Sequence, residues 1–96
     1  MEAARQAIDD AERAQAAQHA APELGQARSK LAAAETAVQN EDMDEAARLA
    51  EEARLDAELA DARTAAAKAQ AANDEIRRAN SAVLDEMERT PTGGTP

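Results

Sequence analysis

Apolar residues recur at spacings of three and four along most of the chain, which is the period of one face of an α-helix. In residues 2–19 the positions predicted to share that face are Ala4, Ile8, Ala11 and Gln15. This pattern stops just before Pro22, which fits the first turn of a new helix because its missing N–H costs nothing there. The second helix continues the spacing of three and four with a predicted buried face of Leu24, Ala27, Leu31, Ala34 and Val38. The pattern therefore predicts helices over residues 2–19 and 22–39.

The stretch "QNEDMDE", residues 39–45, predicts a tight turn into a third helix. Asn40 can adopt the left-handed conformation that ends a helix, and Asp42 with Glu45 matches a capping box. No glycine or proline follows until after Glu88, so an unbroken helix over residues 42–88 would be about 70 Å long. We expect an all-α, three-helix, coiled-coil-like fold in which two short antiparallel helices pack on the N-terminal half of one long helix.

The long helix carries two apolar stripes. At about 100° per residue, the first stripe comprises Met43, Ala46, Leu49, Ala50, Ala53, Ala57 and Ala60. The second stripe begins at Leu55, and its predicted interface residues are Leu59, Ala62, Ala66, Ala69, Asn73, Ile76, Asn80, Val83 and Met87. The first stripe is predicted to face the short helices, which leaves the second without a partner in the chain. We therefore predict that the second stripe is an interface for self-association, as a dimer or a higher oligomer.

Asn73 and Asn80 interrupt the second stripe at equivalent heptad positions. One interpretation is that both lie exposed on a frayed helix. The other is that they are buried between helices, where paired amides fix the register at some cost in stability. The sequence leaves open the orientation of the pairing and whether "NDE" at residues 73–75 caps a fourth helix instead.

Composition limits the chain to one small domain with a thin core. Among the 96 residues, 29 of the 42 hydrophobic ones are alanine, and there is no aromatic residue and no cysteine. We assign residues 1–89 to an alanine-rich helical domain. The tail "TPTGGTP", residues 90–96, is predicted to be disordered or a linker.

The net charge of −9 argues against nucleic-acid binding, which needs a basic face. The lack of aromatic residues also removes the platforms on which single-stranded bases stack. No run of the sequence approaches the roughly 18 apolar residues of a membrane span. Met1 leads directly into helix-forming sequence without the basic and apolar regions of a signal peptide.

No motif predicts an active site. Residues 40–51, "NEDMDEAARLAE", imitate a calcium-binding loop, but the position that needs glycine is Glu45. His19 is the only histidine and has no cysteine with which to form a typical zinc site. Ser29 and Ser81 have no base at a recognisable spacing. We expect no enzymatic activity, no cofactor and no bound metal.

The segments "AIDDAERA" (7–14), "APELGQARSKLAAAE" (21–35) and "DEAARLAEEARLDAELADARTAAA" (44–67) resemble an alanine-rich domain of unknown function. That family occurs in envelope lipoproteins of Gram-negative bacteria, often upstream of an outer-membrane-protein-A-like peptidoglycan-binding domain. The chain departs from the family in lacking a glycine at Asn40–Glu41 and in having "MD" where a "DY" pair is common. The family supplies no functional residues to transfer, and the peptidoglycan-binding domain is absent from this sequence.

The resemblance implies a periplasmic location, with outer-membrane anchoring through a lipidated N-terminus upstream of residue 1. The predicted function is a non-enzymatic envelope domain that acts as a spacer or protein-interaction module. Its expected partners are a second copy of the chain or another envelope protein, with no nucleic acid and no membrane contact beyond the lipid anchor. The alternatives are a cytosolic helical adaptor and a helical ligand-binding domain.

Overall fold

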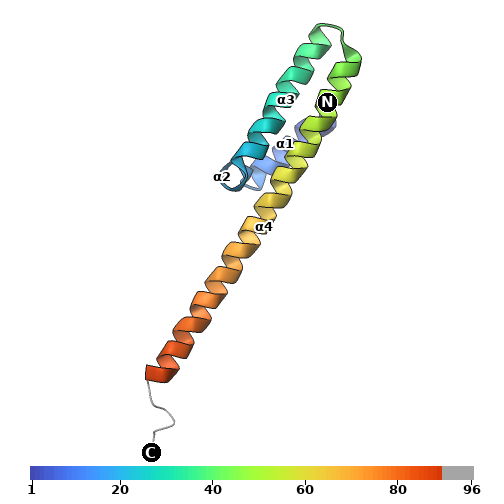
Figure 1. Ribbon diagram of the computed structural model, residues 1–96. Coiled ribbons are helices and arrows are strands. Elements are labelled where there is room, and N and C mark those ends of the chain that lie inside the picture. The colour runs from blue at the N-terminus through green and yellow to red at the C-terminus, as the bar shows by residue number, and fades with distance from the viewer. Residues whose placement is uncertain (90–96) are drawn as a thin grey trace, which may run out of the picture.

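One continuous helix of 47 residues, α4 (Met43–Arg89), forms the axis of the molecule in the computed structural model (Figure 1). The structure describes residues 1–89, and within them every element is a helix. α4 passes through Asn73 without a break, so the sequence "NDE" does not cap a fourth helix. The all-helical class, with short helices beside one long helix, agrees with the sequence-based expectation. The predicted tail, residues 90–96, lies outside the described residues.

The predicted first helix is wrong in one respect, because residues 2–19 form two helices. α1 (Glu2–Arg13) ends before Gln15, and α2 (Ala16–His19) begins after it. Gln15 has a left-handed backbone with φ of 74°, and its N–H donates to Glu12 O at 3.0 Å. Gln15 is consequently exposed and does not continue the buried face of α1. The change of chain direction at Gln15 brings Ala16 and Ala20 into the core instead of Gln15.

The turn between α3 (Ala21–Gln39) and α4 closes one residue later than predicted. Asn40 has φ of −87°, and the left-handed residue is Glu41 with φ of 61°. Glu41 N–H donates to Val38 O at 3.0 Å and Asp42 N–H donates to Ala37 O at 2.9 Å. This pair of hydrogen bonds is a Schellman motif, in which the left-handed position is usually glycine.

The capping box at the start of α4 is only half formed. The Asp42 carboxylate accepts a hydrogen bond from Glu45 N–H at 3.3 Å, as the spacing predicts. The Glu45 carboxylate pairs with Arg48. Asp42 therefore caps the start of α4, whereas Glu45 does not return the hydrogen bond to Asp42 N–H and belongs instead to the surface ion pairs described below.

The core is built almost entirely from alanine. Twelve of its fourteen buried apolar residues are alanine, and the other two are Ile8 and Leu24. Methyl groups allow helix axes to approach near the lower end of the usual 8–10 Å. Each buried methyl contributes little transfer free energy, so the fold depends on close packing along several helices and on the high helix propensity of alanine.

Two details of the predicted buried faces are wrong. Met43 opens the predicted first stripe, but its side chain is 57% exposed because it lies in the first turn of α4, beyond the packed core. At the end of α3 Ala37 is buried in place of the predicted Val38, which is only half-buried. α4 adds Thr64, which is 1% exposed, to the predicted alanines. Thr64 extends the packed part of α4 by one turn beyond Ala60.

Candidate interaction surface

α4 consists of a docked half, residues 43–67, and a projecting half, residues 68–89. The docked half lies beside α1, α2 and α3, and the projecting half extends away from them (Figure 1). Buried residues of α4 end at Thr64, and none of residues 68–89 is buried. We call residues 1–67 the head, because the three short helices and the docked half of α4 form its core together.

The nine residues predicted to form the interface, here called the seam, all belong to α4 and are all exposed. They are Leu59, Ala62, Ala66, Ala69, Asn73, Ile76, Asn80, Val83 and Met87. The large apolar side chains of Ile76, Val83 and Met87 are 58%, 57% and 62% exposed. The seam is therefore an accessible apolar strip about 42 Å long at 1.5 Å per residue.

The seam faces away from the head. At about 100° per residue, its mean direction lies about 150° around α4 from the buried alanines at positions 50, 53 and 57. None of the short helices can therefore cover it without leaving the core. Leu84 is 59% exposed and flanks the seam, although the sequence pattern did not include it. Leu84 directly follows the seam residue Val83 in the sequence, and this adjacency is the signal that would have identified Leu84 as a flanking residue.

Charge is distributed very unevenly between the two parts. The head contains fifteen acidic and seven basic residues, a formal net charge of −8. The rest of the chain contains five acidic and four basic residues, a formal net charge of −1. The seam therefore runs along a nearly neutral helix that extends from an acidic head.

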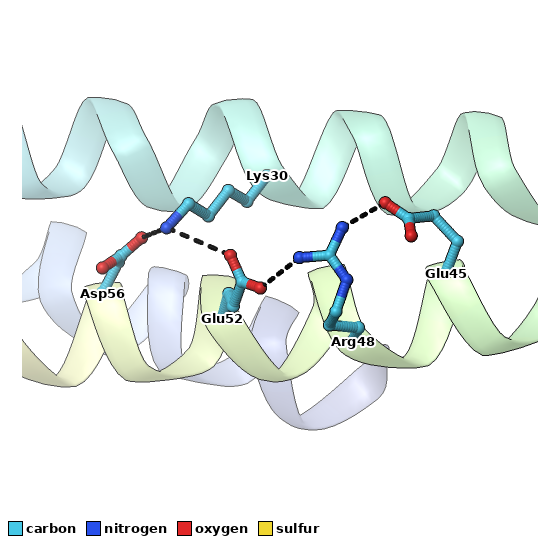
Figure 2. Close-up of polar contacts among 5 residues, drawn as sticks. All are labelled: Lys30, Glu45, Arg48, Glu52 and Asp56. Atoms are coloured by element: carbon cyan, nitrogen blue, oxygen red, sulfur yellow. Dashed lines mark hydrogen bonds and ion pairs between the residues drawn. The ribbon is translucent and has the colours of Figure 1, made fainter.

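Ion pairs connect α3 to the docked half of α4. Lys30 Nζ on α3 lies 2.8 Å from Asp56 Oδ2 and 3.4 Å from Glu52 Oε1 on α4 (Figure 2). This oxygen of Asp56 is buried, and the ammonium group is the charge that compensates it. Pairing with Asp56 is the main reason that the pKa of Lys30 is raised above its ordinary value.

Arginine side chains join neighbouring carboxylates on the exposed side of the docked half. Arg48 pairs with Glu45 and with Glu52, the latter at 2.5 Å (Figure 2). Arg54 pairs in the same way with Glu51 and Glu58. The hydrogen bond from Arg54 lowers the pKa of Glu51. Because these groups are exposed or half-buried, water and salt screen their contribution to stability.

The candidate sites for chemistry are dispersed over the surface. Asp42 and Glu45, from the segment that imitates a calcium loop, serve as a helix cap and an arginine partner. His19 is exposed at the end of α2, and Ser29 and Ser81 are exposed on different helices. Within residues 1–89 no three His, Asp or Glu side chains are placed so that they could hold a metal ion. In the same residues no helix has the combined length and hydropathy required to cross a membrane.

A head with an alanine core and a long helix that carries an exposed seam define the molecule as an all-helical domain with a projecting arm. Residues 1–76 match the family described as Domain of unknown function (DUF4398), and the chain belongs to this family. The match covers the head and the first part of the seam, so Asn80, Val83 and Met87 lie beyond it. Neither the curated proteins nor the solved structures provide a match to this chain.

Proposed function

We propose that the chain is a non-enzymatic helical domain of the bacterial envelope that acts as a spacer and self-associates through the seam. The exposed seam is the observation that carries this proposal. Three large apolar side chains in one strip are each more than half exposed, while the core of the same molecule is nearly all alanine. Burying these side chains against a second copy would remove from water three of the four large apolar side chains of the projecting half.

The proposed location is the periplasm, with outer-membrane anchoring of the full-length protein through a lipidated N-terminus. It rests on the resemblance to envelope lipoproteins, and it is consistent with membership of the DUF4398 family. Determining the native residues upstream of position 1 tests it. A signal peptide that ends in a lipidated cysteine supports the envelope location. A cytosolic start directly before this sequence contradicts it and favours a cytosolic helical adaptor.

We also propose that the short helices α1 and α3 lie antiparallel to each other in coiled-coil-like packing on the docked half of α4. Arg5 of α1 pairs with Glu35, whereas Glu12, two turns further along α1, pairs with Arg28, which comes earlier in α3.

Two further ion pairs support an antiparallel run of α3 along α4, because the order of the paired residues is opposite on the two helices. Glu23 lies 3.2 Å from Arg63, whereas Lys30, two turns further along α3, lies 2.8 Å from Asp56. A spacer needs such a fixed head, since a flexible one would not hold the projecting arm in a defined direction.

Sedimentation equilibrium across about 10–500 μM tests self-association directly. We expect the mass to rise towards a dimer or higher oligomer, with a dissociation constant in the micromolar range, which corresponds to about −8 kcal/mol. An Ile76→Lys, Val83→Lys double variant is expected to stay monomeric, because association would bury two unpaired charges in each copy.

The matched control is an Ala71→Lys, Ala82→Lys double variant. It adds the same charge to the same half of α4, but both positions are exposed on the face opposite the seam. It should associate like the wild type. A wild-type chain that remains monomeric at every concentration contradicts the proposal. Equal association of the two double variants would show that the seam is not the interface.

A further inference from the structure

The seam is asymmetric in side-chain size. After Leu59 at its start, its first half presents only alanine side chains, at positions 62, 66 and 69. Its second half, within residues 76–87, presents Ile76, Val83 and Met87. Because α4 is a continuous helix across both halves, any partner must fit a narrow surface at one end and a broad one at the other.

A second copy fits this surface when it runs in the opposite direction. In a parallel pair, alanine would face alanine in one half and large residues would face each other in the other half. The axes would then need to be about 8 Å apart at one end and about 10 Å apart at the other. In an antiparallel pair the narrow half of each helix faces the broad half of its partner, so one separation serves the seam from Ala62 to Met87.

We propose that two copies pair in antiparallel orientation, with the two-fold axis beside Asp74 and Glu75. The proposal rests on the self-association proposed above and specifies its geometry. In this register, four pairs of facing residues form the layers of the interface, and each pair occurs once on either side of the two-fold axis. They pair Ala62 with Met87 of the second copy, Ala66 with Val83, Ala69 with Asn80, and Asn73 with Ile76.

The charges flanking the seam select this register over its neighbours. Here Gln70 lies beside Arg77 of the second copy, and Glu86 lies beside an alanine. Moving the axis by half a heptad towards the C-terminus places Arg77 of one chain beside Arg77 of the other. Moving it by the same amount towards the N-terminus places Arg77 beside Arg63 of the second copy and Glu86 beside Glu58 of the second copy. Like charges at these flanking positions repel and oppose pairing.

The two asparagines acquire a role in the same register. Asn80 of the second copy faces Ala69, which lies one helical turn before Asn73. The small alanine leaves space for the two amides, which occupy adjacent layers and can hydrogen-bond to each other. The symmetry repeats this contact on the other side of the axis. Paired amides fix register at a cost in affinity, which explains why asparagine interrupts an otherwise apolar seam.

The arrangement gives the molecule a specific shape. The two heads, each with a formal charge of −8, lie at opposite ends of the pair, where their mutual repulsion is screened. The two α3–α4 turns would be about 95 Å apart at 1.5 Å per residue. The pair is therefore a two-headed spacer whose length is set by the register of the seam.

Single-cysteine variants test the orientation, because the chain has no native cysteine. Ala66→Cys and Val83→Cys chains, one of them carrying a mass tag, are mixed and oxidised under mild conditions. Both positions are exposed on α4, so neither substitution disturbs the core. The proposed pair brings position 66 of one chain opposite position 83 of the other, within the 4.4–6.8 Å Cα separation typical of disulfides. Identical positions lie about 25 Å apart.

We expect only the mixed disulfide, and no cross-link from either variant alone. Homodimeric disulfides from each variant alone would show a parallel pair and overturn the orientation while leaving self-association intact. Sedimentation of the reduced variants separates this result from failure of the proposed function, since a chain that is monomeric at all concentrations overturns both. A trimer or tetramer would likewise overturn the two-fold pairing.

Discussion

The two halves of α4 use apolar residues in opposite ways. In the docked half the buried positions are Ala46, Ala50, Ala53, Ala57, Ala60 and Thr64. The projecting half buries none of its residues, although it contains Ile76, Val83, Leu84 and Met87. The smallest side chains of the helix are thus in the core, while its larger ones are exposed to solvent.

This contrast separates two requirements. Small residues in the head let four helices approach closely, and stability there comes from many short contacts. Large residues in the projecting half contribute nothing to folding of the single chain, because no element of the head reaches them. Their apolar surface is useful only if something outside the chain covers it.

The largest expected effect comes from truncating Leu24, the leucine that is buried in the core of the described residues. Leu24 is 1% exposed, and Leu24→Ala should lower the free energy of unfolding by about 3 kcal/mol through lost burial and a residual cavity. Leu84→Ala, the matched change at a 59% exposed position, should cost less than about 0.5 kcal/mol. Urea unfolding followed by circular dichroism at low micromolar concentration measures both. Equal losses would mean that the projecting half is packed in the single chain.

A smaller effect of opposite sign is expected at the turn between α3 and α4. Glu41 is left-handed with φ of 61°, a conformation that costs a residue with a side chain roughly 1–2 kcal/mol. Glu41→Gly should therefore stabilise the head by about 1 kcal/mol. Glu41→Ala removes the same charge but retains the strain, so it should give no such gain. If alanine stabilises as much as glycine, charge rather than backbone strain explains the result.

The smallest effect is the dependence of head stability on pH. The hydrogen bond from Arg54 lowers the pKa of Glu51, so this pair stabilises the head above the ordinary carboxyl pKa of about 4.3. The contribution is lost as the pH falls through the lower folded-state value. Wild type should exceed Glu51→Gln slightly in stability at pH 7, and the difference should vanish in acid and shrink in salt. A difference that persists at pH 2 would exclude this ion pair as its cause.

Sequence periodicity was sufficient to predict α3, the start of α4 and most of its buried alanines, but it left open whether α4 continues through Asn73. Pro22 marks a helix start chemically, and the lack of glycine and proline after Asp42 permits a long helix. The break at Gln15 could not be predicted, because glutamine has no preference for a left-handed backbone and the core imposes it. The exchange of Val38 for Ala37 has a similar origin, since close approach of α3 and α4 favours the smaller side chain.

The seam residues were predicted from their spacing, and the structure places all nine on the exposed side of α4. Their role as an interface remains a prediction. Spacing alone also left the orientation open, because heptad positions are the same in parallel and antiparallel pairs. The distribution of charge between the head and the projecting half, together with the order of small and large residues, is what favours one orientation.

Hydrogen–deuterium exchange at two protein concentrations tests the central claim, that the head folds within one chain and the projecting half requires a second. At about 5 μM, amides of the docked half should be protected and those of residues 68–89 should exchange rapidly. At about 500 μM, protection should extend through residues 68–89 while the docked half changes little. Protection of the projecting half that is already equal to that of the head at 5 μM, or that does not change with concentration, would contradict the account.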